Sequence, residues 1–319
     1  MAGQATKAGA LVAIVGPTAV GKSKLALELA QLLDGEIVNA DSRQIYRYMD
    51  IGTAKPTPAE QALVPHHLID VVNPDESFNL ALYQQLACQA IEDILERGKT
   101  PLLVGGSGLY IWSVIEGWEI PPVPPDPYFR HELEEKATKE GCLSLYRELQ
   151  EIDPRAAEKI DPRNIRRVIR ALEVWHKSGI TISQLWQKRA PSFSTLLIGL
   201  TTARADLYRR IDSRVDFMIE SGLIQEVQEL MEKGYPPNSP ALSGIGYKQI
   251  REYLQGVLDL PTAIQQIKCH THRLARHQYA WLRPSDERIH WLDIREIGQD
   301  IVQLAQDFVT QPDSGTLQR

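Results

Sequence analysis

Eight consecutive residues near the start of the chain have the types and the spacing that bind phosphate. They match the pattern G-x-x-x-x-G-K-[ST] and are Gly16, Pro17, Thr18, Ala19, Val20, Gly21, Lys22 and Ser23. In such a phosphate loop the glycines permit a tight path, and the backbone N–H groups converge on one anion. Lys22 adds a full positive charge, and the Ser23 hydroxyl is suitably placed to ligate Mg²⁺.

The residues on either side distinguish this loop from a chance glycine turn. An apolar run from Leu11 to Val15 precedes it and predicts a buried strand, and a helical pattern from about Lys22 to Leu33 follows it. A strand, a glycine-containing loop and a helix N-terminus in that order form an anion site. We therefore predict that residues 16–23 bind a phosphate or diphosphate group, with Mg²⁺ at Ser23.

A second polar segment follows the next predicted strand, which covers residues 36–40. It begins with Asp41, Ser42, Arg43 and Gln44, and the residues up to Pro56 are too polar for a core element. Ligands of open α/β sheets bind at the carboxyl ends of the strands, so this segment is predicted to line the same site. Asp41 is a candidate general base or a ligand of Mg²⁺ through water, and a helix cap is the alternative.

Apolar runs alternate with helical patterns over most of the chain. Further strands are predicted at residues 68–72, 102–104 and 196–200, which indicates βαβ units and a parallel sheet flanked by helices. The alternation fails between about Trp118 and Pro191, where Asp-Pro pairs at 126, 153 and 161 predict helix starts. We predict a phosphate-loop NTPase-like α/β core from residues 1–117 and 192–311, an all-helical insertion at 118–191, and a disordered tail at 312–319.

The insertion contains a basic amphipathic helix, although the net charge of the chain is −6. This helix is predicted to start at Asp161-Pro162 and to stop at Gly179. One face is predicted to hold Arg163, Arg166, Arg167 and Arg170, and the other to hold Ile165, Val168, Ile169, Leu172 and Trp175. The arginine face fits a nucleic-acid contact, and a solvated surface is the alternative.

A second basic cluster covers residues 268–278 on a long helix that is predicted to begin after Pro261. His270, Arg273 and His277 share one face of this helix. Zinc is an alternative because Cys269 is nearby, but the spacing fits no finger pattern. Contacts to phosphate groups are the favoured interpretation.

Composition excludes other classes of protein. The apolar run at residues 10–20 is short and is interrupted by Gly16-Pro17, so we predict neither a membrane span nor a signal peptide. Three cysteines, at positions 88, 142 and 269, form no CxxC pair, which predicts free, buried thiols in a reducing cytosol. The predicted location is therefore cytoplasmic.

The ordered set of motifs resembles the tRNA dimethylallyltransferases, bacterial type. Besides the phosphate loop, the resemblance rests on DSRQIY at 41–46, IGTAKP at 51–56, HHLID at 66–70, VGGSGLY at 104–110, RRVIRALE at 166–173, GIGYK at 244–248 and RHQ at 276–278. It implies transfer of a dimethylallyl group from dimethylallyl diphosphate to N6 of adenosine 37 in the tRNA anticodon stem-loop, with Mg²⁺ as cofactor. The adenine would flip out of its stack into a channel. We expect a monomeric enzyme.

The resemblance also implies a role for each matched residue. Asp41 would accept the N6 proton, while Lys22, Ser23 and Mg²⁺ would stabilise the leaving diphosphate. Contacts to tRNA are expected from Asp41, Ser42, Arg43, Gln44, Ser107, Arg130, Arg166, Arg167, Val168, Ile169 and Arg170. A turn residue is the alternative for Ser107, and a surface arginine for Arg130. Ala280 and Ser107 stand where the family often has threonine. Alanine has no hydroxyl, so any hydrogen bond that the family makes from position 280 is in question for this chain.

Three other functions compete with this interpretation. The first is a small-molecule kinase with Asp41 as base, and the second is a non-catalytic RNA-binding protein, against which the intact Lys22 and Ser23 argue. The third is an adenylate isopentenyltransferase acting on free AMP, ADP or ATP. The long helical insertion favours tRNA over a free nucleotide.

Overall fold

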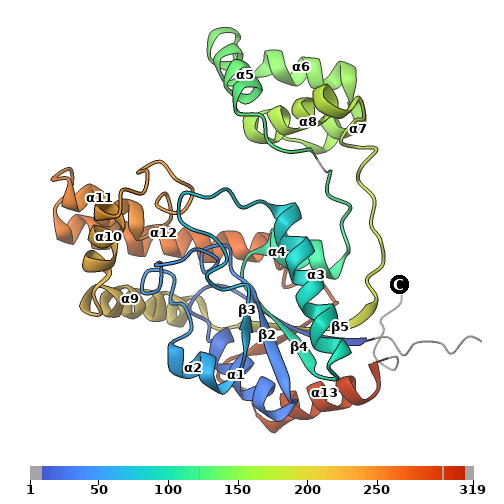
Figure 1. Cartoon of the computed structure of the whole chain (residues 1–319), viewed down its shortest axis with the longest axis vertical. Coiled ribbons are helices and arrows are strands. Elements are labelled where there is room, and N and C mark those ends of the chain that lie inside the picture. Colours follow the sequence, from blue (N-terminus) through green and yellow to red (C-terminus); the bar gives the residue numbers. More distant parts are fainter. Residues whose placement is uncertain (1–8, 122, 297, 313–319) are drawn as a thin grey trace, which may run out of the picture. The chain divides into compact units, whose positions relative to one another are not determined.

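The computed structural model describes residues 9–121, 123–296 and 298–312, which form two compact units (Figure 1). The larger unit consists of the described parts of residues 1–115 and 191–319, and the smaller one of residues 116–190. Of the tail that was predicted to be disordered, residues 313–319 lie outside the described residues.

A parallel sheet forms the centre of the larger unit. Its described strands are β1 (Gly9–Val15), β2 (Gly35–Ala40), β3 (His66–His67), β4 (Thr100–Gly105), β5 (Phe193–Thr201) and β6 (Ile289–Asp293). They lie in the order β3-β2-β4-β1-β5-β6, and every pairing is parallel. Val15 pairs with Gly105, which in turn pairs with Ala40. The carboxyl ends of β1, β4 and β2 therefore lie level with one another.

Helices cover both faces of the sheet. Alternate residues of β1, such as Val12 and Ile14, belong to an apolar cluster with α1 (Lys22–Leu32) and α13 (Gln299–Thr310). On the other face α3 (Leu80–Glu96) contacts β1, β2 and β4 through buried residues that include Ile91. Strands buried on both faces are continuous apolar runs, as in β1. Figure 1 shows α1, α3 and α13 flanking the strands.

Further helices complete the larger unit. They are α2 (Pro58–Leu63), α4 (Gly108–Ile115), α9 (Arg204–Glu220), α10 (Leu223–Glu232), α11 (Tyr247–Leu254) and α12 (Leu260–Trp281). Helices α9 to α12 pack around Ile45 and Met49 in a second apolar cluster. The Asp259 side chain caps α12, and Pro261 lies in its first turn, so the predicted long helix is confirmed.

The smaller unit is helical in its described residues. It contains α5 (Pro127–Glu140), α6 (Cys142–Ile152), α7 (Pro154–Lys159) and α8 (Ile165–Ser178) around their own apolar cluster. Asp126 and Asp153 cap α5 and α7 with a proline in each first turn, as predicted. Helix α8 instead begins after Asn164, whose side chain accepts the Arg167 N–H, so the predicted start at Asp161 was wrong.

The parallel sheet and its flanking helices are confirmed, but besides the start of α8 two local predictions were wrong and one strand was missed. Residues 68–72 form no strand, because Leu68 and Asp70 have φ angles of 63° and 55°, which interrupt an extended backbone. Strand β6 was not predicted. Cys142 and Cys269 are exposed and Cys88 is half-buried, although all three thiols are free. None of the described helices is both long enough and apolar enough to cross a membrane.

Candidate active site

The level strand ends bring three loops together at one edge of the sheet. The phosphate loop follows β1, the segment beginning at Asp41 follows β2, and the Gly106-Ser107 turn follows β4. The Ser42 N–H donates to Ser107 Oγ at 3.0 Å, which joins the second and third loops. Gln278 of α12 joins the first and third, because its Oε1 accepts the Thr18 N–H at 2.8 Å and its Nε2 donates to the Gly106 carbonyl oxygen at 3.0 Å. Residues far apart in sequence thus form one polar site.

The phosphate loop has a backbone path that only small residues permit. Gly16 has φ of 145°, and a Cβ there would lie 2.5 Å from the carbonyl oxygen of Leu200. Ala19 and Gly21 also have positive φ, at 63° and 108°. Gly21 is the N-cap of α1 and supplies no side-chain cap, so the first N–H groups of the helix remain available to an anion.

Lys22 folds back over this loop. Its Nζ donates to the carbonyl oxygens of Gly16 at 3.0 Å and Pro17 at 2.8 Å. The pKa of Lys22 is lowered to about 8, because burial, its largest cause, and the Arg214 guanidinium together outweigh the Asp41 carboxylate, which raises it. The three groups therefore lie close enough to sense one another's charge, with two cations facing one carboxylate.

Asp41 is held by a turn and does not cap a helix. Its Oδ1 accepts the Arg43 N–H at 2.8 Å, and its own N–H donates to Asn39 Oδ1 at 3.0 Å. Asn39 is buried and also donates to the carbonyl oxygen of Leu68 at 3.0 Å. The helix-cap alternative is wrong, because residues 42–45 form turns. The carboxylate has a fixed orientation at the edge of the sheet.

Two cavities meet at Asp41. The larger has a volume of about 450 Å³, within the roughly 300–1,000 Å³ of ordinary ligand sites. Its polar end contains Thr18, Asp41 and Arg214, and its apolar wall includes Val215, Met218, Ile245, Ile267 and Leu274. A smaller cavity of about 70 Å³ shares that polar end and adds Lys22 and Ser23. The arrangement suits a small molecule with an anionic end and an apolar end.

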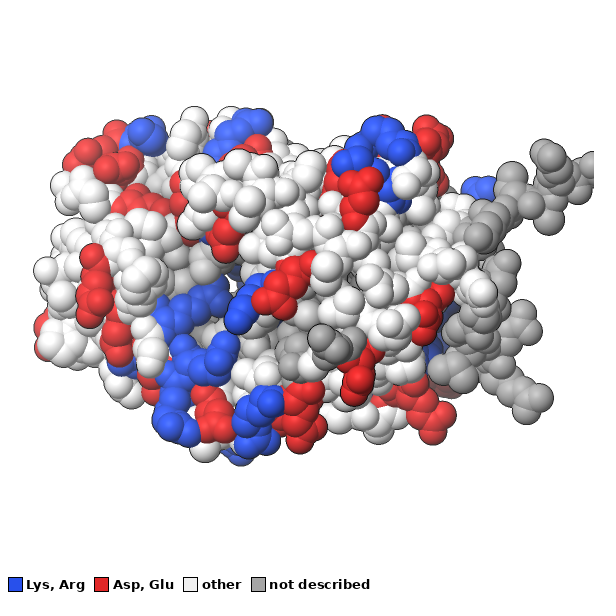
Figure 2. All heavy atoms as spheres, turned by 90° about the horizontal axis from the view of Figure 1, so that it is seen from below, with Lys and Arg blue, Asp and Glu red and all other residues white. Residues whose placement is uncertain are grey.

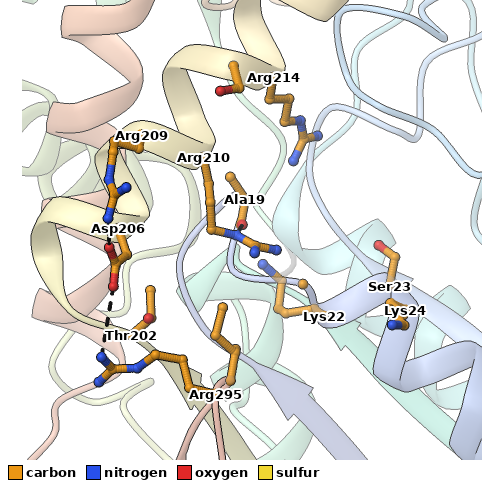
Figure 3. A pocket seen from close by; sticks show the side chains of 13 residues that line it. Ala19, Lys22, Ser23, Lys24, Thr202, Asp206, Arg209, Arg210, Arg214 and Arg295 are labelled. Carbon is orange, nitrogen blue, oxygen red and sulfur yellow. Dashed lines mark hydrogen bonds and ion pairs between the residues drawn. The ribbon is translucent and has the colours of Figure 1, made fainter.

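A third cavity, of about 710 Å³, opens over the outer side of the phosphate loop (Figure 3). Its cationic residues are Lys22, Lys24, Arg209, Arg210, Arg214 and Arg295. The carboxylate among them, Asp206, pairs with Arg209 and Arg295 (Figure 3). Arg210 Nε donates to the Ala19 carbonyl oxygen at 3.0 Å. Figure 2 shows Lys and Arg side chains gathered around a hollow on one face of the molecule.

The other residues of the larger unit that were predicted to contact tRNA lie around the same edge of the sheet. Ser42, Arg43 and Ser107 line the 450 Å³ cavity, and Gln44 lines the smaller one. Arg43 Nη1 donates to the Pro240 carbonyl oxygen at 2.5 Å, and Gln44 Nε2 donates to those of Thr53 and Ala54. Ser107 Oγ accepts the Ser42 N–H and so connects two of the loops, and its contact with tRNA stays a prediction.

The residues predicted on the smaller unit are divided by burial. The side chains of Val168 and Ile169 are 1% and 3% exposed in the apolar cluster, as predicted for the apolar face of the helix, so a tRNA contact of residues 166–170 would not use these two side chains. Arg166 and Arg167 are exposed. Arg163 precedes α8 and pairs with Asp161, so it does not belong to the helix face as predicted. Trp175 follows Val168 and Leu172 at helical spacing, but its side chain is 40% exposed and not buried.

Arg130 and Arg170 have a structural partner in the smaller unit. Arg130 Nε and Nη2 donate to the two oxygens of Glu173 at 2.7 and 2.8 Å, and Arg170 Nη1 donates to Oε2 at 2.5 Å. Burial raises the pKa of Glu173, but hydrogen bonds from Arg130, the Asp126 N–H and Arg170 outweigh it and lower the pKa to about 2. The buried carboxylate orients both guanidinium groups. Arg130 is therefore not a plain surface arginine, which was the alternative for this residue, because it is paired with the buried Glu173.

Sequence reasoning missed two residues of the site. Arg214, on α9, lines all three cavities, and Gln278, on α12, donates from Nε2 to the Gly106 carbonyl oxygen at 3.0 Å. Gln278 belongs to the RHQ motif, so the sequence marked this residue but gave it no function of its own. No motif around Arg214 marked that residue as part of the site. Among the described residues, no group of three or more His, Cys, Asp or Glu side chains forms a metal site.

Comparisons with known proteins identify the family. A family model described as IPP transferase matches residues 44–285. This chain belongs to the IPP transferase family. One relative from that family, the tRNA dimethylallyltransferase of Roseiflexus castenholzii, is 55% identical over 273 residues, which are 86% of this chain and 89% of the relative.

Solved structures agree with membership of the IPP transferase family. The full-length tRNA isopentenylpyrophosphate transferase of Bacillus halodurans is 42% identical with a TM-score of 0.69, and the match covers 95% of this chain and 96% of that one. A eukaryotic dimethylallyltransferase acting on tRNA is 29% identical with a TM-score of 0.83, covering 95% and 80%. The resemblance seen in the motifs is confirmed, and the kinase and non-catalytic alternatives are wrong.

Proposed function

We propose that this chain transfers the dimethylallyl group of dimethylallyl diphosphate to N6 of adenosine 37 in tRNA and releases diphosphate. The observation that carries the proposal is the meeting of an anion-binding loop, a fixed carboxylate and a partly apolar cavity of about 450 Å³ at one point. The names of the relatives, which are tRNA dimethylallyltransferases, support the same reaction. We further propose that the enzyme acts as a monomer in the cytoplasm, where tRNA is found.

The donor diphosphate binds at the start of α1. Backbone N–H groups of the phosphate loop, Lys22 and Arg214 surround that position, and the dimethylallyl chain extends along the apolar wall. Charge grows on the diphosphate as the C–O bond breaks, so cations fixed beforehand stabilise the transition state more than the ground state. The allylic carbon delocalises the positive charge that develops on it.

Asp41 serves as the general base. The lone pair of an adenine amine is delocalised into the ring, so the amine attacks well only if its proton is removed as the new C–N bond forms. The turn at Asn39 and Arg43 holds the Asp41 carboxylate at the polar end of the cavity. The flipped adenine enters from the side lined by Ser107, Leu274 and His277.

The residues present fit a magnesium ion held jointly with the donor. Ser23 and Asp41 both line the 70 Å³ cavity, and their hydroxyl and carboxylate oxygens are hard ligands of the kind Mg²⁺ prefers. Because no cluster of acidic or histidine side chains is found among the described residues, diphosphate oxygens and water would complete the coordination. When bound, the ion would neutralise charge on the diphosphate.

Exposed arginines of the smaller unit bind the anticodon stem-loop through its phosphates. Arg166 and Arg167 in the first turn of α8 are free of the Glu173 network and exposed to solvent, so they carry this role. Arg130 and Arg170 contribute fixed positive charge beside them.

Mass analysis of modified tRNA tests the proposal directly. Unmodified tRNA with adenosines at positions 36 and 37 is incubated with the protein, dimethylallyl diphosphate and Mg²⁺, then digested to nucleosides. We expect a new nucleoside heavier than adenosine by one dimethylallyl group in place of one hydrogen, and little product from free AMP. Unmodified tRNA after prolonged incubation would refute the proposed function, and efficient use of AMP would favour the adenylate-type activity.

A further inference from the structure

One carboxylate outside the three cavities holds a loop that forms their wall. Glu226 lies in the first turn of α10 and lines none of these cavities. It accepts four hydrogen bonds: to Oε2 from the N–H groups of Asp50 at 2.8 Å and Ile51 at 2.7 Å, and to Oε1 from the Gly52 N–H at 3.0 Å and the Tyr247 hydroxyl at 2.6 Å. A single side chain thus satisfies three consecutive backbone donors.

The packing around this carboxylate leaves the loop little freedom. Tyr247 is 1% exposed, and a Cβ added to Gly52 would lie 2.6 Å from the tyrosine ring. Glycine is needed at position 52 because the loop backbone rests directly on that ring. Burial is the main cause of a pKa of Tyr247 well above its usual range, so its hydroxyl stays a hydrogen-bond donor. Glu226 and Tyr247 therefore clamp residues 50–52 from one side.

The clamped loop contacts the reactive end of the site. Gly52 and Thr53 line the 450 Å³ cavity. The Thr53 carbonyl oxygen accepts hydrogen bonds from Gln44 Nε2 at 3.2 Å and from Arg214 Nη2 at 3.5 Å. Besides burial, which lowers the pKa of both cations most, the Arg214 guanidinium lowers the pKa of Lys22 and the Asp41 carboxylate raises the pKa of Arg214, so the three charged groups lie near one another. The Thr53 carbonyl oxygen is therefore one of the groups that orient the Arg214 guanidinium.

We propose that Glu226 is a positioning residue for the transfer reaction. By fixing residues 50–52 it holds the Thr53 carbonyl oxygen that contacts Arg214 and Gln44 at the polar end of the cavity, although it lines no cavity and does not contact Asp41. The proposal rests on the proposed function of this site. Positioning effects of this kind are large because a reacting group displaced by about 1 Å can slow catalysis by roughly 100-fold.

Glu226→Gln tests this role with almost no change in size. The amide keeps one acceptor oxygen, so it cannot satisfy all three backbone donors and the tyrosine hydroxyl together. We expect single-turnover transfer to slow by about 10- to 100-fold. The tRNA dissociation constant should stay within about threefold of the parent value, a change below 0.7 kcal/mol. Glu229→Gln is the matched control, because that exposed residue lies one turn further along α10 and bonds to Gln225.

A double-mutant comparison separates positioning from a merely structural role. If Glu226 acts through Arg214, adding Glu226→Gln to Arg214→Ala should slow transfer by less than about threefold, because the group being positioned is already gone. Calorimetry with inorganic diphosphate gives a second measurement, which does not require the protein to modify tRNA. Here too, Glu226→Gln should weaken binding less in the Arg214→Ala background than in the parent protein. The proposal would be overturned if the double variant lost transfer rate and diphosphate affinity by the product of the two single-variant losses. It would also be overturned if Glu226→Gln transferred the group at the rate of the parent protein. A parent protein that leaves tRNA unmodified while retaining coupled diphosphate binding would refute only the proposed function.

Discussion

The charge on Lys22 makes donor binding depend on pH in a window that the structure specifies. Burial lowers the pKa of this lysine to about 8 in the free protein. A bound diphosphate adds negative charge beside the ammonium group and raises that pKa, so binding takes up a proton when pH exceeds 8. The affinity for the donor diphosphate therefore has its full value well below pH 8, where Lys22 is protonated, and falls as pH rises through 8.

The magnitude follows from the fraction of protonated lysine. With a pKa of about 8, that fraction falls from about 0.9 at pH 7 to about 0.09 at pH 9. The donor dissociation constant should therefore rise about tenfold between these pH values, which corresponds to about 1.4 kcal/mol. The pKa of Lys22 in the complex must exceed 9 for the full change to appear.

Calorimetric titration of dimethylallyl diphosphate at pH 7, 8 and 9 measures this effect. Lys22→Arg is the matched control, because a guanidinium stays charged throughout this range and should remove the slope. Lys22→Met should bind weakly at every pH. Equal affinity of the parent at pH 7 and pH 9, or an undiminished slope in Lys22→Arg, would show that the buried lysine does not meet the diphosphate.

Three further variants probe different parts of the site. Asp41→Asn should slow single-turnover transfer by about 10²- to 10⁴-fold at saturating donor and Mg²⁺ with a small change in the tRNA dissociation constant, and near-normal transfer would rule out this carboxylate as the base. Replacing Arg166 and Arg167 together with alanine should reduce the slope of log tRNA affinity against log salt by about 1–2, and an unchanged slope would assign both to a solvated surface. Gln278→Leu removes the acceptor of the Thr18 N–H and should weaken donor binding by about 1–3 kcal/mol, whereas unchanged donor affinity would contradict a role in shaping the loop.

Short-range sequence patterns determined most of the local structure. The phosphate loop, the strand before it, the helix after it and the Asp-Pro starts of α5 and α7 were all predictable, because a few neighbouring residues decide each of them. The failures have local causes as well. Positive φ angles at Leu68 and Asp70 interrupt a run that is apolar enough for a strand, and Asn164 competed successfully with Asp161 as the cap of α8.

The tertiary structure alone decided which distant groups act together. Glu173 lies 43 residues from Arg130 in sequence, yet it binds both Arg130 and Arg170, so one arginine of the predicted basic face of α8 is already paired. Arg214 and Gln278 come from α9 and α12 and reach the phosphate loop only because those helices pack beside the carboxyl edge of the sheet. Spacing along one helix or loop is fixed by backbone geometry, whereas contacts between elements depend on how their buried faces pack, and a single sequence leaves that unspecified.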